Sequence, residues 1–478
     1  MIKKEFIYPV NIAKSQGNIT NEKELLVPSE KQIHIGTPTK NPTVIHGKSY
    51  IVLDFGIEIR GRIRILCFSA NNKNNCASVR LRFGESLSEA MSELGEKGSC
   101  NDHSPRDFYI PLVGLSDTSW GNTAFRFVRL DFDEESSISL HSVIAEGETL
   151  GLDAKYEYKG NDPLLKKIYT AAKRTIDLCS AGEYVWDGVK RDRLVWIGDM
   201  HPEMLALTTL YGRVPMMDNS INLMRETTPI GNWMCTLATY SAWWLIVLAD
   251  YFKKTSCHDL VLENMDYAEK TVQRFLECIG VDGSLGEVSG SLVDWPTRSK
   301  PDENAGVRAI VIMMAKKAIE LFKEFNRPTD KAEELLKRLM RQPITVTHAM
   351  QVAGLKYMAL GELDKSDIEL MEKLGENGMS TFMSYYILTA YARYFGIERA
   401  VDIMKKYYGG MLSVGATTFW EDFHLEWLDG AGRIDEIAPD GAKDIHGDFG
   451  DYCYKEFRHS LCHAWSTGIL AFMEENGI

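Results

Sequence analysis

The chain contains stretches such as Gly61-Arg-Ile-Arg-Ile-Leu-Cys-Phe68 and Phe125-Arg-Phe-Val-Arg-Leu-Asp-Phe132, in which apolar and polar residues alternate. A period of two is typical of β-strands with one buried face. Similar runs continue from about Ser49 to Ile144, and no helical pattern intervenes until the acidic segment Glu85 to Glu96. The pattern therefore predicts an antiparallel β-sandwich of about 150 residues.

After about Asp162 the apolar residues recur with a period of 3.6, which indicates amphipathic helices. Twelve helices are expected, beginning near Asp162, His201, Pro215, Thr236, Asp259, Ala305, Asp330, Val346, Asp364, Thr381, Ile397 and Ser460. Twelve helices with short connections suit an (α/α)6 barrel, in which six inner helices form the core and six outer helices surround it. We therefore expect a multidomain α and β chain, with an N-terminal antiparallel β-sandwich over residues 1–157 and an (α/α)6 barrel over residues 158–478.

Composition excludes several classes of partner. Against 54 Lys and Arg stand 67 Asp and Glu, and the resulting net charge of -13 disfavours nucleic acid and anionic membrane surfaces. No apolar run reaches the roughly 18 to 20 residues of a membrane span, and the N-terminus shows no signal peptide. We expect a cytoplasmic protein, or a periplasmic one if an export signal has been removed.

The nine cysteines include no CxxC pair and predict neither a disulfide framework nor a zinc site. The sequence is compatible with a homodimer.

The segment Tyr184-Val-Trp-Asp-Gly-Val-Lys-Arg-Asp-Arg-Leu-Val-Trp-Ile-Gly-Asp199 gathers carboxylates, arginines and two tryptophans. Carboxylates accept hydrogen bonds from vicinal hydroxyls, and indole faces pack on the apolar side of a pyranose ring, so this mixture suits a sugar site. A solvated turn with ordinary ion pairs is the alternative interpretation. Leu292-Val-Asp-Trp-Pro296 and Gly415-Ala-Thr-Thr-Phe-Trp-Glu-Asp-Phe423 add further Asp-Trp and Trp-Glu pairs. The second of these opens a long segment, Glu421 to His459, that predicts neither strand nor helix, and loops of that length are usually functional.

These motifs resemble those of the inverting α-L-rhamnosidases, a family of six-hairpin glycosidases. The family pattern Asp-x-x-x-Arg-[Glu/Asp]-Arg-Leu-x-Trp-x-Gly-Asp is matched by Asp187, Arg191, Asp192, Arg193, Leu194, Trp196, Gly198 and Asp199. The family's Gly-Ala-Thr-Thr-x-Trp-Glu is matched by Gly415 to Glu421, and its late Ser-x-x-His by Ser460 and His463. In the N-terminal half, Leu53-Asp-Phe-Gly56, Arg82-Phe-Gly-Glu85 and Phe125-Arg-Phe-Val128 resemble the sandwich that precedes the barrel in these enzymes.

The resemblance implies a glycosidase that releases terminal α-L-rhamnose with inversion, without a metal or other cofactor. It implies that Asp192 is the general acid and Glu421 the general base. It also implies that the sugar is bound by Asp187, Arg191, Trp196, Asp199, Asp294, Trp295 and His463. The family usually has Glu where this chain has Asp192, so either the backbone here approaches the scissile bond more closely or the aglycone differs.

Other interpretations stay open. Another (α/α)6 carbohydrate-active enzyme, either a different glycosidase or a polysaccharide lyase, would use the same architecture, and so would a sugar-binding relative without catalytic activity. The loop Asp444-Ile-His-Gly-Asp-Phe-Gly-Asp451 offers three carboxylates and a histidine to calcium, but it lacks the EF-hand spacing, and we expect a solvated or substrate-facing loop instead.

Overall fold

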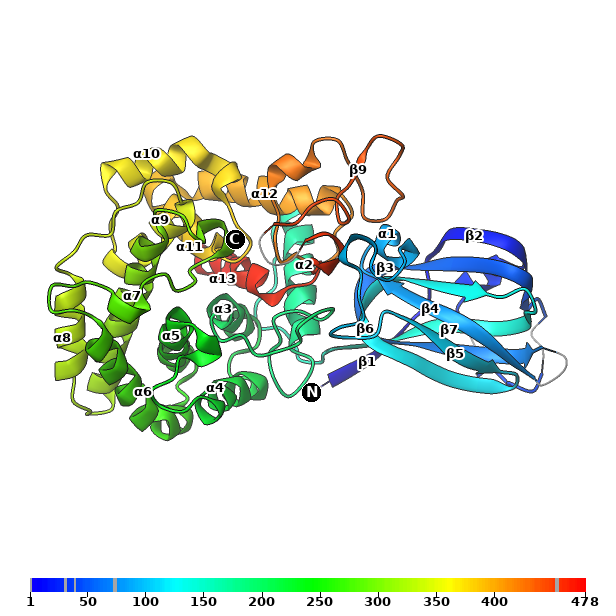
Figure 1. Ribbon diagram of the computed structural model, residues 1–478, viewed down its shortest axis with the longest axis horizontal. Coiled ribbons are helices and arrows are strands. Elements are labelled where there is room, and N and C mark those ends of the chain that lie inside the picture. The colour runs from blue at the N-terminus through cyan, green and yellow to red at the C-terminus, as the bar shows by residue number, and fades with distance from the viewer. Residues whose placement is uncertain (1, 30–31, 38–39, 72–74, 452–454) are drawn as a thin grey trace.

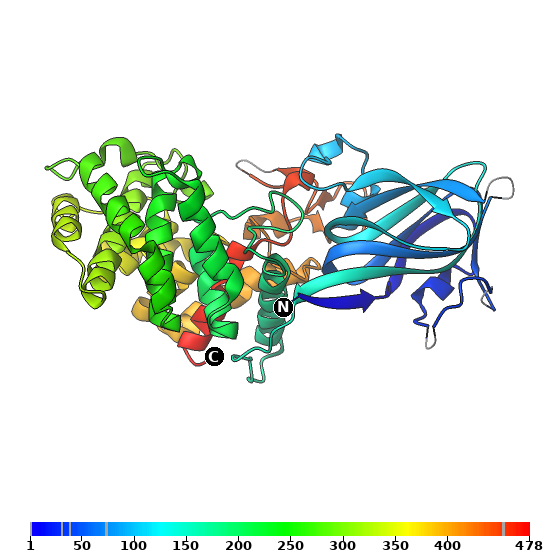
Figure 2. The same cartoon turned by 90° about the horizontal axis from the view of Figure 1, so that it is seen from below.

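The computed structural model describes residues 2–29, 32–37, 40–71, 75–451 and 455–478. Strands occupy one end of the molecule and helices the other (Figures 1 and 2). Within the described residues, no helix is long and apolar enough to cross a membrane.

The N-terminal part is an antiparallel sheet of seven strands. The strands are β1 (Ile2–Ile7), β2 (Asn11–Thr20), β3 (Thr43–Ala70), β4 (Cys76–Gly84), β5 (Asp107–Val113), β6 (Ser116–Phe132) and β7 (Ser137–Leu150). Their order is β1-β7-β3-β6-β4-β5, with β2 also paired to β3. The antiparallel arrangement expected from the period-two runs is confirmed.

The long strand β3 organises this sheet. Its register against β6 shifts between Asp54 and Ile59. Tyr50–Asp54, before the shift, also pair with β2, and Gly61–Cys67, after it, also pair with β7. The first residues of the strand, Thr43–His46, pair with β7 as well. A Cβ at Gly61 would lie 2.0 Å from Glu146 O, so only glycine fits where β3 meets β7. Residues that alternate along β3, β4 and β6, such as Leu53, Phe83 and Phe125, are fully buried and form one core.

The C-terminal part contains α2 to α13. Their bounds are α2 (Pro163–Cys179), α3 (Met200–Tyr211), α4 (Pro215–Thr227), α5 (Ala238–Thr255), α6 (His258–Cys278), α7 (Glu303–Glu324), α8 (Asp330–Leu339), α9 (Met350–Leu360), α10 (Lys365–Leu374), α11 (Ser384–Phe395), α12 (Ile397–Ser413) and α13 (Ile469–Glu475). With α1 (Leu87–Met91), the described residues hold thirteen α-helices. Two-residue strands β8 (Ala431–Gly432) and β9 (Lys443–Asp444) lie in the loop between α12 and α13.

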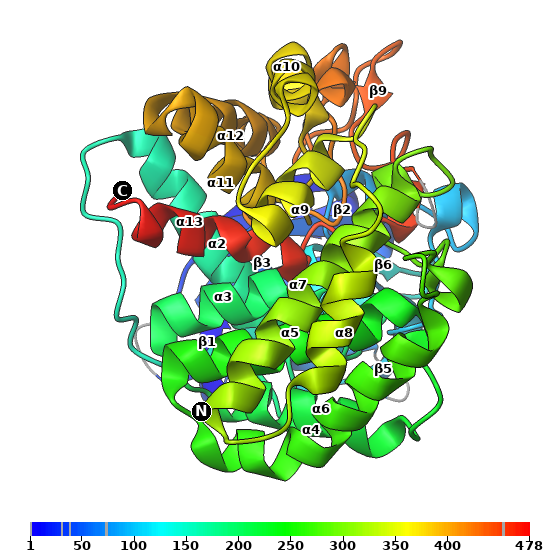
Figure 3. The ribbon, with the colours of Figure 1, turned by 90° about the vertical axis from the view of Figure 1, so that its left-hand side faces the viewer.

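Six of these helices contact one another in a closed circuit. α3 packs on α5, α5 on α7, α7 on α9, α9 on α11, α11 on α13, and α13 returns to α3. Helix α5 is buried almost all round, including Trp243 and Trp244, whereas only Ala332, Leu335 and Leu339 of α8 are buried. Burial on nearly all sides, as in α5, is typical of a helix enclosed by other helices. Burial along one stripe, as in α8, is typical of a helix with one face exposed to solvent. The end-on view of Figure 3 shows α8 outside α5 and α7, with the sheet behind them.

The helix starts agree closely with the periodicity. Helices begin at Pro215, Asp330 and Ile397 as predicted, and Asp162 caps α2 by accepting hydrogen bonds from two backbone N–H groups at 2.8 and 3.1 Å. The last helix begins at Ile469 and not near Ser460, because Ala464–Gly468 forms a 3-10 turn that places His463 in a cavity.

The sheet part contacts the helical part where the site lies. The connection from β4 to β5 packs against the segment before α3 and against the loop before α13. In Figure 1 that loop, which carries β9, lies between the helices and the sheet. Further bonds cross the boundary, for example from Arg60 to Leu178 O at 2.9 Å and from Arg126 to Gly415 O at 3.0 Å.

Candidate active site

A cavity of about 350 Å³ opens where the helical segments and the loop before α13 meet. Its lining comprises Asp187, Asp192, Trp196, Asp199, Cys235, Thr236, Leu237, Tyr240, Leu292, Trp295, Arg298, Glu421, His463 and Trp465. Seven of the nine residues predicted from the sequence line it. Acids and indole rings therefore face the same space, although they come from segments more than 200 residues apart.

The segment between α2 and α3 is closed by its own backbone. Asp187 N donates to Leu194 O at 3.1 Å, and Leu194 N donates to the Asp187 carboxylate at 3.0 Å. Inside this loop Asp192 and Arg193 have φ angles of 56° and 58°, in the left-handed region that costs about 1–2 kcal/mol per non-glycine residue. The guanidinium of Arg193 donates to the backbone and side chain of Asn122 in β6, at 3.0 and 3.1 Å. The sheet thus helps to hold the strained turn.

Arg191 joins the two carboxyl groups expected to do chemistry. Its Nη1 lies 3.1 Å from Asp192 Oδ1, and its Nη2 donates to Glu421 Oε2. The guanidinium is buried, and its Nε donates to Arg458 O at 2.8 Å. One arginine therefore fixes the separation between Asp192 and Glu421.

The backbone around Glu421 is equally constrained. Glu421 N donates to Ser460 O at 3.0 Å, and Ser460 N donates back to Glu421 Oε2 at 3.3 Å. Glu421 O accepts from Trp465 Nε1 at 2.9 Å and from the Thr381 hydroxyl. The carboxyl group is thus positioned by the loop before α13 and by the start of α11.

Two further aspartates lie in the cavity wall under strong desolvation. Burial raises the pKa of Asp187 well above its ordinary value, and the neighbouring Asp192 adds to the shift. Burial also raises the pKa of Asp199, although the Tyr240 hydroxyl, which donates to it at 3.0 Å, opposes that rise. Protonated carboxyls can both donate to and accept from sugar hydroxyls.

His463 lies between these acids and Glu421. Its Nε2 is 3.9 Å from Asp187 Oδ2 and 4.0 Å from Glu421 Oε1. Burial holds the pKa of its imidazole well below the ordinary value, so the ring is neutral. A neutral imidazole in this position provides one more polar group for a ligand.

Two predicted residues do not line the cavity. Arg191 lies behind Asp192 and Glu421. Asp294 is buried, its carboxylate accepts from Ser380 Oγ at 2.6 Å and from Trp295 N at 2.8 Å, and burial raises its pKa to about 7. These bonds cap the turn that carries Trp295 into the cavity wall.

The sequence motifs missed part of the wall. Trp465 stands two residues after the matched His463 and stacks on Phe382 with ring centroids 4.9 Å apart. Tyr240 lies on α5, a helix buried almost all round, where a cavity-facing tyrosine looks like an ordinary core residue. Arg298 follows the Asp294-Trp295 pair by only three residues and could have been found from that spacing.

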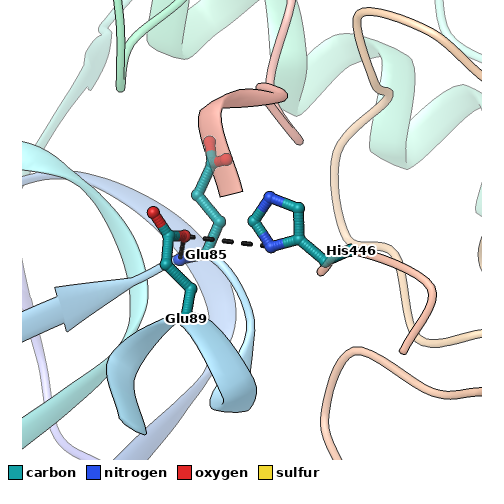
Figure 4. A group of neighbouring side chains, drawn as sticks. All are labelled: Glu85, Glu89 and His446. Carbon is teal, nitrogen blue, oxygen red and sulfur yellow. Dashed lines mark hydrogen bonds and ion pairs between the residues drawn. The ribbon is translucent and has the colours of Figure 1, made fainter. Parts of the chain in front are cut away.

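Two places in the structure gather side chains of the types that bind metal ions. In the loop Asp444 to Asp451, for which the sequence predicts a solvated or substrate-facing loop rather than a calcium site, Asp444 accepts from the backbone of His446 and Gly447. Asp448 accepts from Asp444 N and pairs with Lys97. Among the described residues, the atoms that could bind a metal ion are carboxylate oxygens of Glu85 and Glu89 and a ring nitrogen of His446. They lie within 4.8 Å of one another (Figure 4).

A lysine ammonium sits against that group. Lys190 Nζ lies 2.9 Å from Glu85, 3.4 Å from Glu89 and 3.4 Å from His446 Nε2. It also donates to Phe457 O and His459 O at 2.9 and 2.6 Å. The cluster therefore already contains a cation, which ties the sheet to the loop before α13.

Comparisons with known proteins give structural relatives only. No family sequence model matches the chain, and no curated protein matches its sequence. A rhamnosidase from Klebsiella oxytoca with rhamnose bound aligns at a TM-score of 0.77 and 19% identity, over 100% of this chain and 96% of that one. A GH78 family rhamnosidase of Bacillus sp. GL1 aligns at 0.71 and 16% identity, over 95% of this chain and 48% of that one. The α-L-rhamnosidase of Streptomyces avermitilis complexed with L-rhamnose aligns at 0.65 and 15% identity, over 89% and 42%. The chain thus spans nearly all of the first relative and about half of the other two, and it has the fold of α-L-rhamnosidase structures.

Proposed function

We propose that the protein is an inverting glycoside hydrolase that releases terminal α-L-rhamnose. The observation that carries this proposal is the pair Asp192 and Glu421, held by one buried guanidinium at the edge of a cavity lined with indole rings and further acids. The fold shared with rhamnosidases, two of which contain bound rhamnose, supports the choice of sugar.

In the proposed reaction Asp192 protonates the departing glycosidic oxygen. Glu421 takes a proton from a water molecule that attacks the anomeric carbon from the opposite face. Inverting enzymes hold the two carboxyl groups roughly 6.5–9.5 Å apart to leave room for that water. The Arg191 bridge limits the separation here to the reach of one guanidinium.

The remaining residues of the wall bind the sugar in this proposal. Asp187, Asp199 and His463 exchange hydrogen bonds with hydroxyls, and these bonds tighten as the ring flattens toward an oxocarbenium ion. Trp196 and Trp295 pack on the apolar face of the ring. Asp294 acts indirectly, by fixing Trp295. A volume of about 350 Å³ is at the lower end of the usual 300–1,000 Å³ for ligand sites, which suits one terminal residue.

The architecture proposed with this function has two domains, a β-sandwich over residues 1–157 and an (α/α)6 barrel over residues 158–478. The closed circuit of α3, α5, α7, α9, α11 and α13 supports the barrel, since the other helices alternate with these along the chain.

Hydrolysis of an aryl α-L-rhamnoside tests the proposed function, beside equally activated aryl glycosides of other sugars. We expect release of the aryl group from the rhamnoside at a higher kcat/KM than from any other member of the panel. A preference for another sugar would indicate a different glycosidase, and absorbance from a new double bond on a uronate polymer would indicate a lyase. Thermal stabilisation by rhamnose without any turnover would indicate a binding protein.

A further inference from the structure

We propose that His103, supplied by the sheet, is a positioning residue for Asp192 that holds its left-handed turn, and with it the carboxyl group, in place at the cavity. The inference rests on the proposed role of Asp192 as general acid. His103 lies in the connection between β4 and β5, outside every motif recognised in the sequence.

The imidazole contacts both ends of the Asp192 residue. The backbone N–H of Asp192 donates to His103 Nδ1 at 3.0 Å, and Asp192 Oδ1 lies 3.2 Å from the same nitrogen. On the other side of the ring, Nε2 lies 3.2 Å from Asp102 Oδ2. The three residues form a row from the protein surface to the cavity, because the side chain of Asp192 is 8% exposed, that of His103 29% and that of Asp102 40%.

The hydrogen bonds define the tautomer. Since Nδ1 accepts the Asp192 N–H, the ring proton is on Nε2, where it faces the Asp102 carboxylate. The single lone pair on Nδ1 is thus used by the backbone N–H of Asp192. His103 fixes the backbone of Asp192, and the Arg191 guanidinium, 3.1 Å from Oδ1, fixes its carboxyl group.

His103 is itself held in place. Asp102 pairs with Arg458 Nη1 at 2.5 Å, and the next residue, Ser104, donates to Lys190 O at 3.0 Å. The β4–β5 connection is thus fastened to the segment that carries Asp192 and to the loop before α13. Residue 192 is not glycine, so its left-handed backbone conformation is strained, and the β4–β5 connection can hold it in place.

Two substitutions separate this role from a general loss of structure. In His103→Asn the side-chain oxygen occupies the position of Nδ1 and still accepts from Asp192, whereas His103→Leu has similar bulk and no acceptor. Both are compared with the parent through kcat and kcat/KM, on an aryl α-L-rhamnoside with a poor leaving group and on the 2,4-dinitrophenyl analogue. His46→Asn, at an exposed histidine of β3, is the matched control.

For His103→Leu we expect a loss of kcat of about tenfold on the poor leaving group, because the general acid is no longer held in place, and a much smaller loss on the dinitrophenyl substrate, which needs little protonation. His103→Asn restores the parental rates on both substrates, and His46→Asn does not change them.

Equal losses on both substrates, or parental rates for His103→Leu, would overturn the inference while leaving the proposed function standing. If the parent protein releases the aryl group from neither substrate, both the proposed function and the inference are wrong.

Discussion

Replacing Glu421 by Gln is expected to lower kcat on an aryl α-L-rhamnoside by roughly 10²–10⁴-fold, the usual contribution of a positioned general base. Gln keeps the size of the side chain, and its oxygen can still accept from Arg191 and from Ser460 N. The ability to take a proton is lost, so kcat falls while KM should change little. The negative charge beside the buried Arg191 guanidinium is lost as well, so the melting temperature should also fall. The measurement is steady-state kinetics with a melting curve of each variant.

The matched control is Glu426→Gln, an exposed position in the same loop that should keep parental activity. Asp192→Asn completes the test, because loss of the acid should matter most for a poor leaving group, while Glu421→Gln should affect good and poor leaving groups alike. If Glu421→Gln kept activity within a few-fold of the parent, Glu421 would not be the general base.

Replacing Lys190 by Met is expected to destabilise the fold by roughly 3–5 kcal/mol, as removal of one partner from a buried ionic cluster generally does. Burial raises the pKa of Glu85 to about 7 although Lys190 opposes the rise. Burial by itself would lower the pKa of Lys190, but Glu85 and Glu89 raise it above the ordinary value. Without the ammonium, two buried carboxyls and two carbonyls lose their cation. Urea and thermal unfolding measure the loss.

Lys254→Met is the control, since Lys254 pairs with Glu475 at the surface and its loss should change stability by no more than about 1 kcal/mol. The double variant Lys190→Met with Glu85→Gln should recover part of the stability. If the parent instead gains stability from added zinc and loses it with a chelator, the cluster is a metal site and not a lysine-centred one.

Periodicity predicted the helical part well because most of its helices bury a regular stripe. α8 and α12 begin where the sequence placed them. The edge strands β1 and β2 were missed, because their residues are mostly exposed and show no alternation of apolar and polar types. The start of α13 was placed nine residues too early, because the 3-10 turn at Ala464–Gly468 is buried like the helix that follows it.

The site was predicted in part for a similar reason. Asp192 and Glu421 stand in recognisable local patterns, and the structure brings both to one cavity. His103 reaches Asp192 from 89 positions earlier in the chain, through the docking of a loop between strands. No local spacing signals such a contact, because it depends on how the two parts of the chain pack. The contacts of Arg191 with both carboxyl groups could not be predicted either, because Glu421 lies 230 positions later in the chain.

We propose that Asp192 and Glu421 hydrolyse α-L-rhamnosides with inversion of the anomeric configuration. Proton NMR of the first sugar released tests this reaction most directly. During hydrolysis of an aryl α-L-rhamnoside the account predicts that β-L-rhamnose appears first and that the α anomer follows only by mutarotation. Initial release of α-L-rhamnose would contradict the proposed mechanism, and no release of rhamnose would contradict the proposed function itself.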